Sequence, residues 1–521
     1  MIKYARGKFI MSPDFKNITY KYKPTLELTE NELKACSELY SKHYGVYTKD
    51  SPMNPGRQVH FPVSMYKEHY QKQNFYVALA YDKTKLIAQA FYIRKSITKR
   101  KQVYFIFQLV VNKEYRRHGI ATHLMTSIWG FSNCYAWGLV TPNIRTVKTL
   151  ESATYRKCTP SIIAEHLKDI KKITQELFFI DNNKINVDAE HSIVNTNFYV
   201  ERNLDPKKDY GKWLLGDLPA GYEWLAFTFK EQQMDIKKYK SMFPNIIKFS
   251  EENLKIAYGR MRKKTQQWTK GHAKECNYIL EKLNINKPIN IIDIGCGIGR
   301  HSIELAKKGH FITAIDFTKQ NISYAKKVRK KSNIKNIRFY CSDIRKFKTT
   351  KKYDLALCLY DVIGSFPNKA DNIAIIKKAY NILNKNGYFI LSVMNFELTE
   401  HIVPESQKVN LLEHPEALMN LEPSKDMMTT GNIFNPKYLI IDTKTDLIYR
   451  KEQFTSYRWY YLPAEYVICD KRYTMKEISK ILKEQGFKII EKKFVQAGKF
   501  DIELTNTNPF AKEILLICQK V

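Results

Sequence analysis

Apolar and polar residues alternate along two long stretches of the chain, and each stretch predicts strands interspersed with helices. In the first stretch, short runs rich in β-branched and aromatic residues predict strands over residues 18–23, 75–81, 86–94, 102–111 and 135–140. In the second, near-continuous apolar runs predict buried strands over residues 291–294, 310–315, 336–341 and 353–359. Helical segments separate these runs, so both stretches are predicted to be α/β domains.

The first strand of the second stretch leads into a glycine-rich turn. Residues 291–299 read Ile-Ile-Asp-Ile-Gly-Cys-Gly-Ile-Gly, and a helical segment then runs from Arg300 to its end at Gly309. Glycine has no side chain, so the backbone of such a turn can come close to a ligand. The turn therefore predicts a ligand site at the carboxyl end of this strand.

Acidic residues follow each of the next three predicted strands. Asp316 ends the second strand, Asp343 follows the third, and the pair Tyr360-Asp361 follows the fourth. In a doubly wound sheet, ligands bind at the carboxyl ends of the strands, so these side chains are expected to lie at one site. A carboxylate at the end of the second strand can accept hydrogen bonds from both hydroxyls of a ribose.

These motifs together resemble the class I S-adenosylmethionine-dependent methyltransferases, from about residue 258 to the C-terminus. The pattern Asp-x-Gly-x-Gly-x-Gly is similar to the methyltransferase form, whereas nicotinamide enzymes more usually show Gly-x-Gly-x-x-Gly. The resemblance implies a Rossmann-like, doubly wound sheet, S-adenosylmethionine as cofactor, and Tyr258, Trp268 and His272 as caps on its pocket. It also implies that Tyr360 or Asp361 orients an acceptor amine or hydroxyl. The cofactor-binding residues that it implies are Asp293, Gly295, Cys296, Gly297, Gly299, Asp316, Phe317, Asp343, Ile344 and Leu359.

The last part of the chain carries an insertion. Apolar runs over residues 437–441, 447–454 and 456–461 predict an antiparallel sheet before a helix over residues 471–485. In the family that this region resembles, such a sheet forms a lid in enzymes that act on small molecules. Methyltransferases that act on amino groups in DNA typically carry the motif Asp/Asn-Pro-Pro-Tyr/Phe after the fourth strand. Here the sequence at that place is Leu359-Tyr360-Asp361-Val362. It also lacks the Pro-Cys pair of cytosine-ring methylation, so a small acceptor is favoured.

A second strand–turn–helix motif lies in the first stretch. Asn112 follows the strand over residues 102–111, and a helix begins just after Gly119. Arg116 and Arg117 make the turn basic, and the free backbone amides at the start of a helix attract anions. The turn therefore predicts a phosphate site.

This basic turn resembles the pyrophosphate loop of the N-acetyltransferase (GNAT) superfamily, whose pattern Arg/Gln-x-x-Gly-x-Gly/Ala is matched by residues 116–121. The resemblance covers about residues 18–160 and implies a mixed-sheet domain that binds acetyl-coenzyme A. The cofactor-binding residues that it implies are Val111, Arg116, Arg117, His118, Gly119, Ile120, Ala121 and Asn143.

Two positions depart from that family's pattern. Gln108 is the polar candidate on the strand where many members carry a catalytic Glu, and Gln cannot act as a base. Leu150 stands where many members carry a Tyr that acts as general acid. Tyr155 is the nearest Tyr and is therefore the candidate for that role. Acid–base groups from the loop that holds His60 and Tyr66 are one alternative. A neutral amine that needs only positioning is another, and a domain that binds without turnover is a third.

Composition limits the partners only in part. The net charge is +34, which is typical of nucleic-acid binders, but Lys far outnumbers Arg, as an AT-rich genome would dictate for any protein. Nucleic acid therefore remains an alternative partner to a small molecule. The nine Cys include no Cys-x-x-Cys pair, so neither a metal site nor a disulfide framework is predicted. No secretory or membrane segment is expected, and the cytoplasm is the predicted location.

The sequence thus predicts two transferase domains, over residues 1–235 and 246–521, with a polar linker near residues 231–245. The expected function is N-acyl transfer from acetyl-coenzyme A and methyl transfer from S-adenosylmethionine to a small metabolite or a modified nucleoside. Two alternatives stay open: modification of DNA or tRNA, and a fold retained only to sense its ligand.

Overall fold

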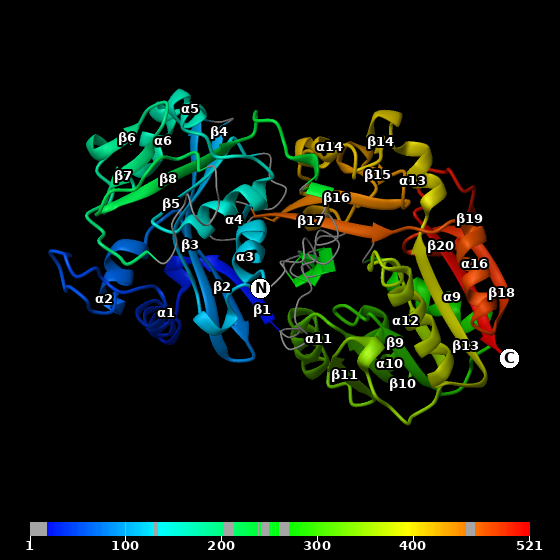
Figure 1. Cartoon of the computed structure of the whole chain (residues 1–521). Coiled ribbons are helices and arrows are strands. Elements are labelled where there is room, and N and C mark those ends of the chain that lie inside the picture. The colour runs from blue at the N-terminus through cyan, green and yellow to red at the C-terminus, as the bar shows by residue number, and fades with distance from the viewer. Residues whose placement is uncertain are drawn as a thin grey trace, which may run out of the picture. The chain divides into compact units, whose positions relative to one another are not determined.

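The computed structural model describes residues 18–98, 101–129, 134–202, 213–237, 239–240, 250–251, 253–255, 257–259, 270–454 and 464–521. The chain divides into two compact units between residues 242 and 243, and each has its own eight-stranded sheet (Figure 1). Most of the predicted linker beyond residue 240 lies outside the described residues. The domain limits given above therefore stay predictions.

The first unit is built on a mixed sheet in which one pairing of the described strands, between β4 and β5, is parallel. That pairing extends only from Val103 opposite Ala136 to Ile106 opposite Leu139, so the two strands separate toward their carboxyl ends. The mixed sheet agrees with the predicted fold class. In spatial order the strands are β1 (Ile18–Pro24), β2 (Phe75–Asp82), β3 (Lys85–Thr98), β4 (Lys101–Val111), β5 (Ala136–Thr141), β8 (Tyr222–Phe229), β7 (Ser192–Asn195) and β6 (Ile185–Val187).

Local sequence signals explain where the helices of the first unit begin. Thr29 and Glu32 form a capping box at the start of α1, as the sequence predicts. The helical stretch over residues 160–174 is not a single element. It is broken into α5 and α6 at His166, whose backbone leaves the helical region and whose ring is held by the Tyr135 hydroxyl at 2.7 Å. The helices are α1 (Glu30–His43), α2 (Val63–Met65), α3 (Ile120–Trp129), α4 (Ile144–Thr154), α5 (Pro160–Glu165) and α6 (Leu167–Thr174).

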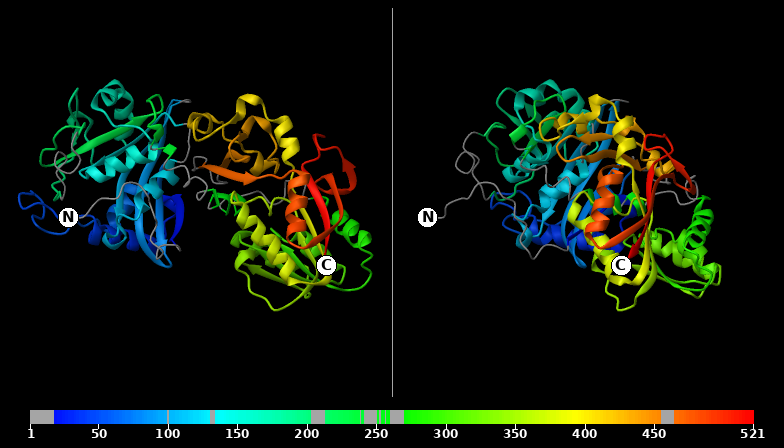
Figure 2. Two further views of the ribbon diagram at one scale, coloured as in Figure 1. Left: turned by 45° about the vertical axis from the view of Figure 1, so that its right-hand side comes forward. Right: turned by 90° about the vertical axis from the view of Figure 1, so that its right-hand side faces the viewer.

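The second unit is a doubly wound sheet, as predicted (Figure 1 and Figure 2). Its first five strands are parallel, and β20 is inserted antiparallel beside β13. Alternate residues of the strand Asn290–Ile294, the first of this unit along the chain, point to opposite faces of the sheet. Ile292 and Ile294 join one buried cluster, and Ile291 joins the other. In spatial order the strands are β11 (Ile337–Cys341), β10 (Phe311–Asp316), β9 (Asn290–Ile294), β12 (Tyr353–Cys358), β13 (Leu383–Met394), β20 (Glu513–Lys520), β18 (Phe487–Gln496) and β19 (Lys499–Leu504).

Helices cover both faces of this sheet, which explains why its strands are apolar throughout. One face packs against α12 and α16 through residues such as Ile375 and Ile478, and the other against α9, α10 and α11 through Ile279, Ile303 and Ile322. None of the described helices of the chain is long and apolar enough to cross a membrane. The helices are α9 (His272–Lys282), α10 (Arg300–Lys307), α11 (Lys319–Lys331), α12 (Lys369–Ile382) and α16 (Met475–Glu484).

A small sheet is inserted between β13 and α16, as predicted, but its third strand differs. That strand is β17 (Ala464–Lys471), which pairs antiparallel with β16 (Leu447–Phe454), whereas the predicted strand over residues 456–461 lies outside the described residues. The predicted helix start at residue 471 is also wrong, because Thr474 caps α16 by accepting from the Glu477 amide. The remaining elements of the insertion are α13 (Phe396–Ile402), β14 (Lys408–Val409), α14 (Pro415–Asn420), α15 (Asp426–Thr429) and β15 (Ile440–Asp442).

Candidate functional site

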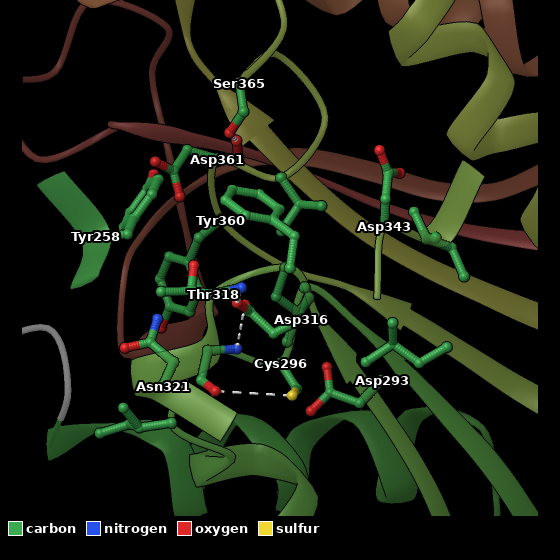
Figure 3. Close-up of a pocket in the computed structure, with 18 of the residues that line it drawn as sticks. Tyr258, Asp293, Cys296, Asp316, Thr318, Asn321, Asp343, Tyr360, Asp361 and Ser365 are labelled. Atoms are coloured by element: carbon green, nitrogen blue, oxygen red, sulfur yellow. Dashed lines mark hydrogen bonds between the residues drawn. The ribbon is translucent and has the colours of Figure 1, made fainter. Parts of the chain in front are cut away.

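The carboxyl ends of β9, β10, β11 and β12 surround a cavity in the second unit (Figure 3). This is the edge where a doubly wound sheet binds its ligand. The predicted cofactor residues of this unit line the cavity, with Gly299 as the exception. The lining residues among them are Asp293, Gly295, Cys296, Gly297, Asp316, Phe317, Asp343, Ile344 and Leu359.

The three glycines of the turn have different roles, although all three have a positive φ, between 53° and 78°. A Cβ at Gly295 would lie 2.3 Å from Val362 Cγ2, and one at Gly299 would lie 2.7 Å from Phe339 Cε1. Gly297 has no neighbouring atom within 4 Å of such a Cβ. Gly295 and Gly299 thus allow close packing of the protein itself, whereas Gly297 is open to the cavity. That the three glycines admit a cofactor stays a prediction.

Asp316 is held by the turn and still has capacity to bind a ligand. One carboxylate oxygen accepts from the Gly297 amide at 2.9 Å and the other from the Thr318 amide at 2.6 Å. Burial raises the pKa of Asp316, and the Thr318 amide, the Thr318 side chain and the Gly297 amide oppose that rise. Each carboxylate oxygen has a second lone pair, so the side chain can accept two further hydrogen bonds from adjacent hydroxyls.

Asp293 and Asp343 are committed to protein contacts. Asp293 is buried, which raises its pKa, and it accepts from the Ser302 hydroxyl, which fastens α10 to β9. Burial also acts to raise the pKa of Asp343, but the bidentate Arg345 guanidinium, at 2.7 and 3.0 Å, outweighs this and keeps the pKa below its usual range. Asp343 therefore lines the cavity as an ionised carboxylate whose charge is balanced by the Arg345 guanidinium.

The hydroxyl of Tyr360 is bound by a carboxylate that sequence reasoning missed. Glu275 on α9 is fully buried, accepts from Tyr360 at 2.8 Å, and is also bonded to His301 Nε2 at 2.7 Å and to the Gly498 amide at 2.7 Å. The sequence signal for Glu275 was its position next to Cys276, on the face of the helix that is buried. Asp361 faces the cavity beside Tyr360, so the structure brings both predicted residues to its edge. Their catalytic roles stay predictions.

A second cavity adjoins the first. The two share Tyr258, Tyr360 and Asp361, which lie at one end of the first cavity (Figure 3). Its other walls come from residues 426–434 of the insertion, from residues 496–499 between β18 and β19, and from Phe510, Lys512 and Glu513 before and at the start of β20. A ligand in the first cavity and a second molecule in this one would meet at the three shared residues.

The basic turn of the first unit forms the expected strand–turn–helix. A short 3-10 helix (Lys113–Tyr115) follows β4, Arg117 and Gly119 have φ of 68° and 77°, and α3 begins at Ile120. Arg116 donates from Nε to the Val111 carbonyl at 3.0 Å. Burial and the nearby Arg145 lower the pKa of Arg116. Two guanidinium groups thus lie close together near helix starts, an arrangement that favours an anion.

The remaining acyltransfer candidates lie in different settings. The Asn143 side chain accepts from the Arg145 amide at 2.9 Å and caps α4. Gln108 is buried in a network with Gln89, Tyr66 and Tyr70, in which Tyr66 donates to Gln108 at 3.0 Å. Tyr155 is buried at the end of α4, where burial raises its pKa. The role of Tyr155 as an acid stays a prediction.

One further carboxylate of the first unit was missed. Glu223 lies on β8 next to the residue that pairs with Thr141 at the carboxyl end of β5, and it is 5% exposed. Burial raises the pKa of Glu223 to about 7, against the opposing effects of Thr196 and Arg202. A carboxyl group with a pKa near neutrality can act as a base, so Glu223 is a candidate for the role that a Glu on the strand before the pyrophosphate loop has in many family members. An acidic residue on an apolar strand was the available signal.

Comparisons with known proteins match part of each unit to a family. Residues 37–137 match the acetyltransferase (GNAT) family, and residues 285–429 match a methyltransferase domain. The ubiquinone biosynthesis O-methyltransferase of Rickettsia akari is 32% identical over 123 residues, which are 23% of this chain and 47% of that protein. The malonyl-[acyl-carrier protein] O-methyltransferase of Bacillus anthracis is 28% identical over 130 residues, 24% of this chain and 45% of that protein. The chain thus spans about half the length of these curated relatives.

Solved structures similar to part of the chain include methyltransferases. An S-adenosylmethionine-dependent methyltransferase from Clostridium acetobutylicum has 17% identity and a TM-score of 0.34, over 47% of this chain and 90% of that one. The glycopeptide N-methyltransferase MtfA has 11% identity and a TM-score of 0.31, over 48% of this chain and 90% of that one.

Proposed function

We propose that the protein is a bifunctional transferase. The proposal starts from the match of residues 37–137 to the GNAT acetyltransferase family and of residues 285–429 to a methyltransferase domain. One domain, within residues 1–235, transfers an acyl group from acetyl-coenzyme A to an amine. The other, within residues 246–521, transfers a methyl group from S-adenosylmethionine. The observation that carries the proposal is Asp316, held by the Gly297 and Thr318 amides with its remaining lone pairs at the cavity.

In the methyltransferase domain, the chain's own residues mainly position the reactants. Asp316 accepts the two ribose hydroxyls, and Gly297 leaves room for the cofactor beside the backbone. When bound, S-adenosylmethionine supplies a methyl group that is already activated on a positively charged sulfur. Asp361 and Tyr360 stand between the two cavities and orient the acceptor. Such positioning, with exclusion of water, supplies most of the catalysis that an in-line transfer needs.

In the acyltransferase domain, the basic turn binds the pyrophosphate of coenzyme A. The amides at the start of α3, together with Arg116 and Arg117, supply the positive potential. The separation of β4 from β5 beyond residues 106 and 139 supports a site for the pantetheine arm between them. Burial raises the pKa of Glu223 to about 7, so this carboxylate is proposed to take the proton of the acceptor amine.

Replacement of Gly119 by Glu is expected to abolish coenzyme A binding and leave S-adenosylmethionine binding intact. The new side chain would bring a negative charge to the pyrophosphate site, in a backbone conformation with φ of 77°. The measurement is the rise in melting temperature that each ligand gives. Gly56→Glu is the matched control, because Gly56 has φ of 69°, is exposed and has open space around it. Coenzyme A that fails to protect the unaltered protein would refute the acyltransferase assignment.

The preferred acceptor is a small metabolite or a modified nucleoside in the cytoplasm. The alternative is modification of DNA or tRNA, which the charge of +34 favours. The test incubates the protein with labelled methyl and acetyl donors and a cell extract, with and without nuclease. Labelled products below about 1 kDa that survive nuclease treatment support the proposal, and label that is released only by nuclease supports the alternative. Binding of both ligands with no labelled product would indicate a sensing role.

Binding to duplex DNA is expected to be weak and independent of sequence. If the positive charge is compositional, the dissociation constant should lie at about 10⁻⁴ to 10⁻⁶ M at physiological salt, the range of non-specific binding. Fluorescence anisotropy with several duplexes of different sequence measures it, and a salt titration gives the number of phosphate contacts. A nanomolar affinity for one sequence would instead establish DNA as the substrate.

A further inference from the structure

We infer that the second cavity is built for an amine, and that Glu513 removes the proton from the acceptor nitrogen before methyl transfer. This inference rests on the proposed methyltransferase function and specifies its substrate class. Its basis is the set of polar groups that meet where the two cavities join. They include two carboxylates and two phenols, Asp361, Glu513, Tyr258 and Tyr360, and all of these except Glu513 line both cavities. The second cavity is also lined by Asp426 and by Lys270, Lys274, Lys499 and Lys512.

Glu513 is a buried carboxylate with unused hydrogen-bonding capacity. It lies at the start of β20, is 5% exposed, and lines the second cavity. Its Oε2 has no hydrogen-bond partner among the described residues. A buried carboxylate oxygen without a partner is costly to maintain, so it indicates a group that a ligand completes.

Tyr258 gives the same indication independently. Its hydroxyl is also buried without a hydrogen-bond partner among the described residues, and its side chain lines both cavities. By contrast, the Tyr360 hydroxyl is already bonded to Glu275. The free acceptor at Glu513 and the free hydroxyl at Tyr258 are therefore left for the second molecule.

The surrounding charges tune Glu513 for an ammonium group. Burial raises the pKa of Glu513 to about 8, Asp361 and Glu275 add to the rise, and Ser392 and Arg472 oppose it. Lys512, the preceding residue, instead donates to Asn432 at 2.9 Å. An alkylammonium such as that of lysine has a pKa of about 10.4. Proton transfer to Glu513 is therefore only mildly unfavourable, as general base catalysis requires.

Oxygen acceptors fit this site poorly. An aliphatic hydroxyl resembles water, whose pKa of about 15.7 is far beyond the reach of a carboxylate. A phenol has a pKa of about 10, but its conjugate base is an anion that Asp361 and Glu513 would repel. An amine is cationic before deprotonation, neutral when it reacts, and cationic again as product. Of these acceptors, the amine thus carries charge of the sign that Asp361 stabilises in the product, when Glu513 is protonated.

The step balances in atoms and electrons. The ammonium gives one proton to the ionised Glu513 carboxylate and becomes a neutral amine. The nitrogen lone pair then forms the new bond to the methyl carbon, while the electron pair of the carbon–sulfur bond passes to sulfur and leaves a neutral thioether. The product is a methylammonium ion, which Asp361 stabilises at the junction of the cavities.

The test uses the full chain, ¹³C-methyl S-adenosylmethionine and a low-molecular-weight cell extract, with the position of the new methyl group read by NMR. A methyl group on nitrogen is expected, and Glu513→Gln should lower the rate at least about 100-fold, the lower end for general base catalysis. Glu503→Gln, on the exposed side of β19, is the matched control and should keep full activity. A methyl group on oxygen, sulfur or carbon overturns the inference, as does a Glu513→Gln variant that is folded and fully active.

A binding arm separates this inference from the proposed function. With S-adenosylhomocysteine present, melting temperatures are recorded with benzylamine and with benzyl alcohol as matched probes. Protection by the amine alone, lost in Glu513→Gln, supports an amine site whether or not turnover occurs. Equal protection by both probes, or protection by neither, overturns the amine site. A lack of labelled product beside selective amine protection would refute the proposed methyl transfer and leave the amine site standing.

Discussion

Substitution of Asp316 by Ala is expected to weaken S-adenosylmethionine binding by two orders of magnitude or more. The variant loses two charge-assisted hydrogen bonds to the ribose, worth about 1.5–3 kcal/mol each, and each 1.4 kcal/mol is about a tenfold change in affinity. It also releases the Gly297 and Thr318 amides, which the carboxylate holds at 2.9 and 2.6 Å. Titration calorimetry measures the affinity directly.

The control for Asp316 separates ligand binding from stability. Asp501→Ala removes the same carboxylate from an exposed position on β19 and should leave the affinity unchanged. Asp316→Asn should be intermediate, because an amide keeps one acceptor oxygen. Coenzyme A should protect all three variants as it protects the unaltered chain. An unchanged affinity in Asp316→Ala would remove the observation on which the methyltransferase proposal depends.

The strands and turns of both units could be predicted from local sequence because their causes are local. Continuous apolar runs identify the strands that are buried on both faces, and the glycines at 295, 297 and 299 identify the turn. The same reasoning placed Asp316 and Asp361 at the cavity, since strand ends meet at one edge. Family resemblance then supplied the cofactors, which periodicity alone does not give.

Contacts between residues that are distant along the chain could not be predicted from the sequence. Two of the partners of Glu275, Tyr360 and Gly498, lie 85 and 223 residues away along the chain. The distinct roles of Gly295 and Gly299 depend on Val362 and Phe339, and nothing in the turn itself indicates them. Glu223 was missed for the same reason: its pKa is raised by burial, which only the assembled sheet creates.

The inserted sheet depends on one buried carboxylate that sequence alone did not single out. Asp470 on β17 bonds to Arg450 Nη1 and, at 3.1 Å, to Arg472 Nε, and all three side chains are at most 2% exposed. Arg450 also bonds to Glu452 at 3.2 Å. Arg472 continues to the Ile433 carbonyl at 2.8 Å and lies 4.2 Å over the ring of Phe434. Ile433 and Phe434 are walls of the second cavity.

Asp470→Asn is therefore expected to destabilise the second unit by about 3–5 kcal/mol, the cost of breaking a buried ion pair by removal of one partner. The variant leaves two buried guanidinium groups: Arg450 keeps its ion pair with Glu452, and Arg472 loses its ion pair with Asp470. A loss of this size corresponds to a fall in melting temperature on the order of 10 °C for a domain of 150–250 residues. The transition to follow is the one that S-adenosylmethionine protects.

The matched control for Asp470 is Asp501→Asn, the same chemical change at an exposed position, which should shift the melting temperature by less than about 1 °C, within the range of ordinary surface substitutions. Because Arg472 holds Ile433 and Phe434, Asp470→Asn should also weaken amine protection while Asp316 still binds the cofactor. A variant as stable as the control would mean that the two guanidinium groups lose no stabilisation without the carboxylate. The cluster could then not be what keeps the cavity wall in place.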